Sequence, residues 1–316
     1  MNFRNPPAMG DFLFLYNMIM FPFTQIENKN YPSIIMGEDR FTGWFYKSET
    51  NYKTEELRAK AYYESIDIAY QLGVRGFSMS PHPTLIEVLN NFKKDHPDIV
   101  CIANPHFQKN YYLNNESLWT SDNLGRLAAT IYNRYSKELK NINWFREIDK
   151  YQPFSYEEIN NFSLNTNEYS NNLNIFNQFC DFSLIGNLHQ SALLLLNRQD
   201  LVIKESELVR KAGMIPILMC EAGVLAIEKG KNIDCGAYWI MMNEELGVPN
   251  ISELIEYIKT VNKPITAYKA FTRSDGFNAK KTIKFFNKVD QVKSLVVGVE
   301  NSDQAEETFS LLNKLI

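Results

Sequence analysis

Cysteine is scarce in this chain, and its placement excludes a disulfide scaffold. There are four cysteines among 316 residues, and no two of them stand in the CxxC spacing of metal or redox motifs. Short secreted domains that depend on disulfides are much denser in cysteine. Each cysteine instead lies in or beside an apolar segment, so we expect buried thiols in a reducing compartment. The four are Cys101, Cys180, Cys220 and Cys235.

The chain also has no apolar run long enough to cross a bilayer as a helix, which requires about 20 residues. The most apolar segment, Phe12–Phe23, falls short of that length. Asp11 precedes it directly, and the sequence that follows offers no small-residue cleavage site of the secretory type. We therefore interpret residues 1–30 as an apolar extension packed on the rest of the fold, and we expect a cytoplasmic protein with no membrane partner.

A basic surface is absent too. Lysine and arginine number 33 against 37 acidic residues, with the two signs interspersed and a formal net charge of -4. Nucleic-acid binding needs a basic stripe or patch, so this partner is not expected. The hydrophobic fraction of 45% is ordinary for a globular protein and sufficient for a large core. A small-molecule substrate is the expected partner, and self-association into a homo-oligomer stays open.

Apolar runs recur along the chain at regular intervals. Most are continuous rather than alternating, as in parallel strands that are buried on both faces. The runs are Ser33–Gly37, Gly76–Ser80, Ile99–Asn104, Asp181–Gly186, Ile215–Cys220, Gly236–Met241, Pro264–Tyr268 and Ser294–Gly298. Segments with helical periodicity separate them, and the one before Gly76 starts at Thr54, a typical N-cap. Strand followed by helix, eight times, predicts one (β/α)8 TIM-barrel domain over 1–316.

One connection is much longer than the others. Residues 107–178, between the third and fourth predicted strands, contain one clear helical stripe and an asparagine-rich stretch over 160–179. Loops that follow strands emerge on the catalytic face of such a barrel, so this insertion is predicted to act as a lid over the mouth. A general bias of the chain toward asparagine is the alternative explanation.

Three of the four histidines follow predicted strands at similar positions, in the segments FSMSPH, CIANPH and SLIGNLH. If their strands are neighbours, His82, His106 and His189 converge on one sector of the mouth, where barrel enzymes hold their active sites. Three imidazoles and a carboxylate, with Glu221 the best placed, would bind Zn, Mn or Fe and leave one position open. The alternative is that these histidines are ordinary loop residues.

Lys269 stands at the end of the seventh predicted strand. In a desolvated pocket the pKa of a lysine falls, and it then acts as a base or a nucleophile. The alternative is a structural ion pair with Glu221 or Glu300. The last strand and helix offer an anion site at the helix start. The predicted substrate-binding residues around these groups are Glu38, Asp39, Asn187, Tyr268, Arg273, Gly298 and Asn301.

The segments IIMGEDRFTGWF, KPITAYKAF and SLVVGVENSDQAEET resemble parts of the aldo-keto reductase superfamily. The resemblance implies a (β/α)8 barrel and puts Tyr268 where the family's tyrosine stacks on nicotinamide. The usual catalytic tetrad is lacking. Ser78 and Ser80 stand near the place of its aspartate, CIANPHF has no lysine, and Gly186-Asn187 lies near its histidine. Gln304 stands where many members have a basic residue for the cofactor phosphate.

Three functions follow from these residues. The leading expectation is a lyase or isomerase that moves a proton beside the carbonyl of a small sugar or hydroxy-acid derivative. In this reading the three histidines polarise the carbonyl, directly or through a divalent metal, and Lys269 and Glu221 move protons. The second is an NAD(P)-linked oxidoreductase of the aldo-keto reductase type with a rebuilt site. The third is a non-catalytic barrel that serves as a binding protein.

Overall fold

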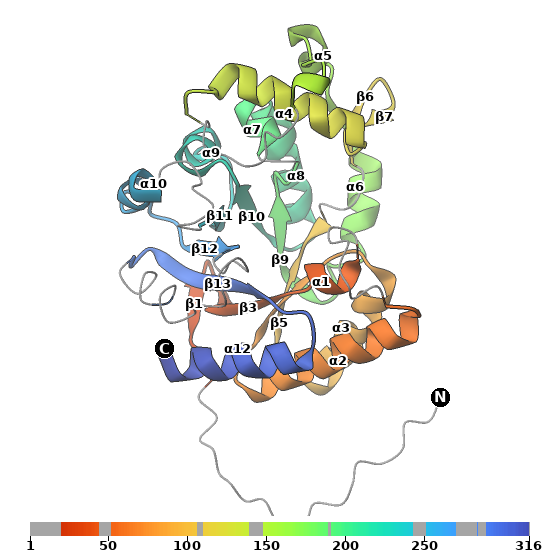
Figure 1. The fold of residues 1–316 in the computed structure, drawn as a ribbon, viewed down its shortest axis with the longest axis vertical. Helices are drawn as coiled ribbons and strands as arrows, with labels where there is room; N and C mark the ends of the chain where they lie inside the picture. Colours follow the sequence, from red (N-terminus) through yellow and green to blue (C-terminus); the bar gives the residue numbers. More distant parts are fainter. Residues whose placement is uncertain are drawn as a thin grey trace, which may run out of the picture.

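Eight parallel strands close into a barrel in the order of the chain (Figure 1). The computed structural model describes residues 20–43, 52–105, 110–138, 148–188, 191–242, 251–269, 283 and 289–315. The barrel strands are β3 (Ile34–Gly37), β4 (Gly76–Met79), β5 (Val100–Ala103), β9 (Cys180–Ile185), β10 (Ile215–Cys220), β11 (Ala237–Met241), β12 (Ile265–Tyr268) and β13 (Val292–Gly298). Each lies on one of the eight predicted apolar runs, so the predicted (β/α)8 fold is confirmed.

The interior of the barrel is filled with side chains rather than open. Ile35, Ile102, Phe182, Ile217 and Met241 belong to one buried cluster inside it. Their strand neighbours face outward into a second, larger cluster beneath the helices. This two-sided burial explains why the strands are continuous apolar runs. The filled interior also restricts any ligand site to the rim.

Helices surround the barrel on the outside (Figure 1). They are α1 (Asp39–Thr42), α2 (Glu55–Gln71), α3 (Pro83–Asp95), α7 (Ala192–Leu195), α8 (Gln199–Lys211), α9 (Gly223–Gly230), α10 (Ile251–Ile258) and α12 (Ser302–Leu315). The predicted N-cap of α2 is confirmed, because Thr54 Oγ1 accepts a hydrogen bond from the Leu57 backbone N–H at 3.3 Å. The last helix, α12, packs against α2 and so joins the two ends of the barrel sequence.

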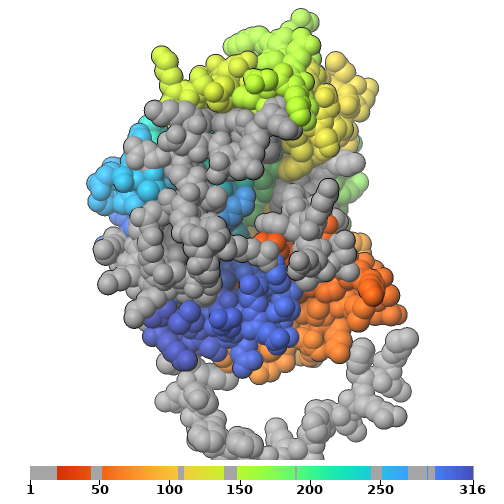
Figure 2. All heavy atoms as spheres, viewed as in Figure 1, coloured from red at the N-terminus to blue at the C-terminus, as the bar shows by residue number. Residues whose placement is uncertain are grey.

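The insertion between β5 and β9 forms its own small subassembly. It contains β6 (Tyr111–Leu113), β7 (Glu116–Ser117), α4 (Ser121–Tyr135), the 3-10 helix η2 (Ile148–Lys150), α5 (Tyr156–Asn160), β8 (Ser163–Leu164) and α6 (Thr166–Leu173). Strand β6 pairs with both β7 and β8. Figure 2 shows the yellow-green part of this insertion at the opposite end of the molecule from α2 and α12. Helix α4 packs on α7, and α6 packs on α8.

Helix α6 shows what the asparagine-rich stretch does locally. Asn165 is its N-cap and accepts a hydrogen bond from the Glu168 backbone N–H at 3.2 Å. Asparagine is weak inside helices but strong at this position. No helix was predicted here, because the low helix propensity of the stretch outweighed the capping signal.

A β-hairpin closes the floor of the barrel. Strands β1 (Phe23–Ile26) and β2 (Lys29–Pro32) pair with each other in antiparallel fashion. The hydroxyl of Tyr31 lies 2.9 Å from Thr266 Oγ1, and its ring meets Phe182 edge to face at 4.9 Å. The end of the N-terminal extension therefore packs under the barrel, with the rest of it outside the described residues.

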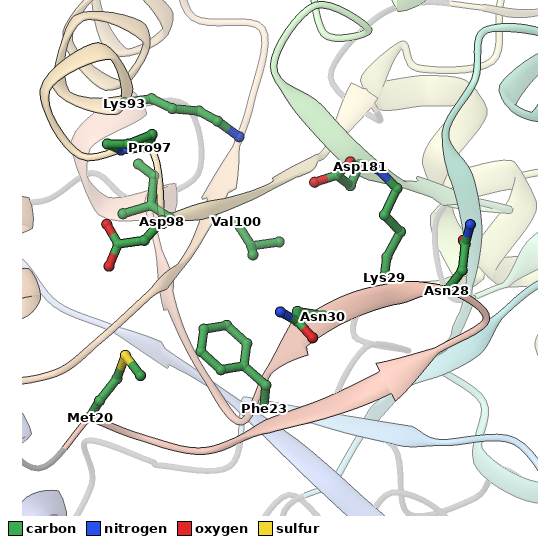
Figure 3. A pocket seen from close by; sticks show the side chains of 11 residues that line it. Met20, Phe23, Asn28, Lys29, Asn30, Lys93, Pro97, Asp98, Val100 and Asp181 are labelled. Atoms are coloured by element: carbon green, nitrogen blue, oxygen red, sulfur yellow. Dashed lines mark hydrogen bonds and ion pairs between the residues drawn. The ribbon is translucent and has the colours of Figure 1, made fainter.

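A cleft of about 490 Å³ lies beside this hairpin. Figure 3 shows Lys29 and Asn30 on the hairpin and Lys93, Asp98 and Asp181 around the same hollow. Its cations are already paired: Lys29 Nζ lies 2.8 Å from Asp181 Oδ1, and Lys93 Nζ donates to the Phe179 carbonyl at 2.7 Å. The first contact ties the floor hairpin to β9, and the second ties α3 to the chain just before β9.

Within the described residues, no helix combines the length and apolar character needed to cross a membrane. All four cysteines are buried and form no disulfide, as the sequence analysis predicted. Burial raises the pKa of the Cys101 thiol to about 12. These thiols therefore act as small apolar groups in the core.

Gly76→Ala tests how tightly the floor is packed. A Cβ at this position would meet Pro32 Cγ and would lie 2.7 Å from the Ile34 carbonyl oxygen. Overpacking of this kind costs about 1–3 kcal/mol, so we expect denaturant unfolding to show a loss of that size. Gly298→Ala is the control, since a Cβ there meets nothing within 4 Å. Equal stability of the two variants would contradict the close packing between hairpin and barrel.

Candidate functional site

A cavity of about 300 Å³ opens at the carboxyl ends of the barrel strands. This is the face on which barrels of this kind carry their active sites. Its lining comes from all eight strands or from the residues that follow them, and from the insertion. The lining residues are Gly37, Asp39, Ser78, Asn104, Trp119, Leu184, Asn187, Met219, Glu221, Trp239, Tyr268, Lys269 and Val296.

A phenol and a carboxylate are paired on one wall of this cavity. Tyr268, at the end of β12, donates a hydrogen bond from its hydroxyl to Glu221 Oε1 at 2.7 Å. Glu221 follows β10, and its own backbone N–H donates to Ser191 Oγ at 2.9 Å. Burial first and the Glu221 charge second raise the pKa of Tyr268 well above its ordinary value of 10. Tyr268 therefore stays protonated at neutral pH and holds the Glu221 carboxylate in place.

Lys269 lies at the rim of the same cavity. Its φ of 51° is left-handed, a conformation that is rare for a residue other than glycine, asparagine or aspartate. Backbone strain of this kind is typical of functional sites. Its Nζ lies 5.6 Å from the centre of the Tyr268 ring. The Lys269 charge also acts on the Asp39 carboxyl, whose pKa it lowers against the larger raising effect of burial.

The carboxylate expected beside Lys269 was Glu221 or Glu300. Asp39 is the carboxyl on which the described structure shows the lysine acting. Glu300 instead forms an ion pair with Arg40, with 3.3 Å between Nη1 and Oε1. The short helix α1 places Asp39 on the cavity and Arg40 beside Glu300. Glu221 lines the same cavity as Lys269, so a pairing of these two stays a prediction.

Glu38 is a second buried acid at the same end of the barrel. Its side chain is 1% exposed, and Ser80 and Asn104 lie close enough to act on it. Burial, followed by the charge of Asp39, raises the pKa of Glu38 to about 8. At neutral pH Glu38 is therefore mainly a neutral acid, which donates as well as accepts hydrogen bonds. Unlike its neighbour Asp39, it does not line the cavity.

His82 occupies a different position from the one expected. It is the N-cap of α3, directly before Pro83, and it is 8% exposed. Glu55 and Arg58, both on α2, act on its charge, and burial is the main cause that lowers its pKa. It is not among the cavity-lining residues. The Pro83 helix start places this histidine beside the outer helices instead of in the mouth.

The metal prediction finds no support in the described part of the chain. There, no group of three or more histidine, cysteine, aspartate or glutamate side chains is arranged to hold a metal ion. His106 and His189, the other two proposed ligands, lie outside the described residues, as does Arg273. A site that contains His106 and His189 therefore stays a prediction, whereas His82 does not line the cavity.

The predicted anion site at the start of α12 is largely occupied by the protein itself. Asn301 Oδ1 accepts a hydrogen bond from the Gln304 N–H at 2.9 Å, and Gln304 Oε1 accepts one from the Glu300 N–H at 2.7 Å. Asp303 adds a negative charge in the first turn. Gly298 ends β13 beside this turn but does not line the cavity.

Two tryptophans of the cavity were not predicted. Trp239 lies inside β11, and its ring meets Tyr268 at 6.4 Å between centroids with planes 60° apart. Its place within an apolar strand, two residues before the strand end, was a usable signal. Trp119 comes from the insertion, between β7 and α4, and nothing local in the sequence indicates its approach to the mouth. The insertion thus lines part of the mouth, and lid movement stays a prediction.

Glu38→Gln tests whether Glu38 is a neutral buried acid. The folded protein keeps the proton up to about pH 8, whereas the unfolded chain releases it near 4.5. The stability due to this group is full below pH 4.5 and is lost as the pH rises through 8. The glutamine stays neutral, so the stability of the variant relative to the parent should rise from pH 5 to 8, by at most about 1.4 kcal/mol per unit.

Unfolding free energies measured across that pH range check this expectation. The exposed Glu56→Gln is the matched control, and its difference from the parent protein should not change with pH. A constant difference for Glu38→Gln as well would mean that Glu38 is ionised throughout.

Comparisons with known proteins give a fold and no closer relationship. No family model matches the chain, and no curated protein matches its sequence. Among solved structures, a Pseudomonas aeruginosa protein described as an aldo-keto reductase superposes with a TM-score of 0.58 at 11% identity. The match covers 96% of this chain and 99% of that one.

A second solved structure is the holo form of an aldo-keto reductase from Bacillus halodurans. It superposes with a TM-score of 0.53 at 9% identity and covers 92% of this chain and 91% of the other. Identities this low establish architecture only. The chain therefore has a divergent (β/α)8 barrel that resembles the barrel of the aldo-keto reductases.

Proposed function

We propose that this protein is an oxidoreductase that uses a nicotinamide cofactor on a small, polar, carbonyl-bearing substrate. The observation that carries the proposal is that two pairs of ionisable side chains interact at one cavity in the barrel mouth. Tyr268 donates a hydrogen bond to Glu221, and the positive charge of Lys269 lowers the pKa of the Asp39 carboxyl. The aldo-keto reductases among the structural neighbours support the same reaction class.

The cavity fits the nicotinamide end of such a cofactor. Three aromatic side chains line it, Trp239, Tyr268 and Trp119, against which a flat ring would pack. Asn187 and Asn104 also line it, and their amides would bind a carboxamide. The start of α12 fits a phosphate poorly, because its own side chains cap it and Glu300 and Asp303 add negative charge. The cofactor, when bound, would supply a hydride to the substrate carbon.

Lys269 is the group best suited to protonate the substrate. Reduction of a carbonyl places negative charge on its oxygen, and a positive group with a transferable proton stabilises that charge. Lys269 carries both and borders the cavity. Asp39 lines the same cavity, and its carboxyl would orient the ammonium through the electrostatic contact between them. Tyr268 is excluded as the acid in this arrangement, since its proton is already donated to Glu221 and its pKa is raised.

The lyase or isomerase reading is the second candidate, and one observation favours it. Lys269 shares the cavity with two carboxyl groups, Asp39 and Glu221, so proton removal and proton return beside a carbonyl are possible without any cofactor. In that reaction Glu221 would accept the proton and Lys269 would stabilise the enolate oxygen.

Cofactor titration separates these functions. Two of the four tryptophans line the cavity, so NADH or NADPH bound there should quench protein fluorescence. Lys269→Met should retain binding and lower the reduction rate of small aldehydes or ketones by about 10²–10⁴-fold, the usual contribution of a positioned acid. Lys293→Met, on the exposed side of β13, is the control and should keep full activity.

Three outcomes would contradict the proposal in different ways. Substrate proton exchange with solvent in the absence of any nicotinamide indicates the lyase or isomerase. Quenching without turnover of any carbonyl compound indicates a binding protein. Full activity of Lys269→Met removes this lysine from the mechanism.

A further inference from the structure

A buried acid lies behind the mouth, on a helix of the outer ring. Glu205 belongs to α8 and is 4% exposed. Its neighbours on the same helix face are apolar: Leu201, Val202 and Val209 are all buried with it. A carboxyl group at a core position of this kind is costly unless other polar groups meet it.

The polar groups that meet Glu205 come from two other parts of the chain. The backbone N–H of Gly186 donates to Glu205 Oε2 at 2.6 Å. The hydroxyls of Tyr111, on β6, and Tyr169, on α6, also act on the carboxyl. Both tyrosines are at most 3% exposed. Neither hydroxyl makes a well-aligned hydrogen bond to the described residues, yet both lie close enough to Glu205 to lower its pKa by hydrogen bonding. Two buried hydroxyls are thus aimed at one buried acid.

A cavity of about 10 Å³ lies among these groups. That volume is about the size needed for one water molecule, and a buried water requires two to four polar partners. Glu205, Tyr111 and Tyr169 supply three. Trp119 and Asn187 line both this cavity and the larger one at the mouth, so the two are adjacent.

The Gly186 turn connects the acid to the mouth. Gly186 has a φ of 70°, and a Cβ there would lie 2.9 Å from Leu218 Cδ1. The chain needs glycine at this point in order to place Asn187 in the mouth. The hydrogen bond from the Gly186 N–H to Glu205, on α8, holds that turn in place.

We propose that the small cavity is an internal hydration site and that Glu205 is the positioning residue that joins the insertion to the barrel. One water links its carboxyl to Tyr111 and Tyr169, while Gly186 N–H binds its other oxygen. The arrangement sets both the insertion, with Trp119, and the Asn187 amide at the mouth. This proposal rests on the proposed function only where it gives Asn187 a role in binding a ligand.

The charge state of Glu205 follows from its surroundings. Burial raises its pKa to about 7, and the contacts from Tyr111, Gly186 and Tyr169 oppose that rise. Among the described residues, the titratable groups that face it are these two phenols, whose own pKa values are raised well above 10. Between pH 5 and 8 Glu205 is therefore the member of the cluster that titrates. Its stabilising effect is full below pH 4.5 and is lost as the pH rises through 7.

Glu205→Gln isolates this charge. Glutamine keeps the size of the side chain, accepts from Gly186 and stays neutral. Relative to the parent protein, its melting temperature should be nearly unchanged at pH 5 and should rise progressively toward pH 8. Glu207→Gln, exposed on the same helix, is the control and should follow the parent curve. A difference for Glu205→Gln that does not vary with pH would overturn the assignment.

Hydrogen exchange at a single pH tests the positioning role without any ligand. In Glu205→Ala, the segments 110–113, 166–173 and 182–188 should all exchange faster than in the parent. In Glu205→Gln, all three segments should keep the slow exchange of the parent. Faster exchange confined to α8 would mean a local helix effect and would overturn the proposal. If the alanine variant does not fold, Tyr169→Phe replaces it, with faster exchange expected in 110–113 and 166–173.

A high-resolution crystal structure tests the hydration site itself. It should show one water within hydrogen-bond distance of Glu205 and of at least one of the two tyrosine hydroxyls. Direct bonds from both tyrosines to the carboxyl, with no water, would overturn the hydration site. All three tests use the protein without nicotinamide or substrate, so a failed cofactor titration has no bearing on them.

Discussion

Closure of the parallel barrel is the constraint on which the rest of the structure depends. Every strand pairs with a neighbour on both sides, so the eight carboxyl ends form one ring. Apolar side chains fill the interior, and the floor hairpin seals one end with Tyr31 and Ile26. Polar groups that leave the strand ends therefore have a single place to gather, at the open rim. The cavity with Asp39, Glu221, Tyr268 and Lys269 is a direct consequence.

The rim places ionisable groups at the border of an apolar interior, and their protonation follows from that position. Tyr268 and Glu38 both have raised pKa values, with burial as the largest cause. The polar groups are also distributed differently from the tetrad implied by the resemblance to aldo-keto reductases. Among the lining residues, a serine lies in β4 and asparagines follow β5 and β9, whereas the charged groups follow β3, β10 and β12.

The insertion makes the mouth more than a rim of strand ends. Trp119 supplies one wall of the cavity, and Tyr111 and Tyr169 meet Glu205 behind it. Buried polar clusters of this kind are specific, because each group must find its partner or bear the cost of desolvation. The insertion and the barrel are thus joined by a few polar contacts as well as by the apolar packing of α4 and α6.

The sequence by itself determined the barrel and the residues at its rim. Apolar periodicity is a local signal, and it located all eight strands, the cap at Thr54 and the buried cysteines. It also indicated Asp39, Glu221 and Lys269 as residues that follow strands. Only the tertiary structure decided which of them meet. Tyr268 bonds to Glu221, His82 lies beside α2, and Glu205 faces two tyrosines from a distant insertion. These pairings depend on barrel closure and on the direction of short turns, which residue patterns along a strand do not encode.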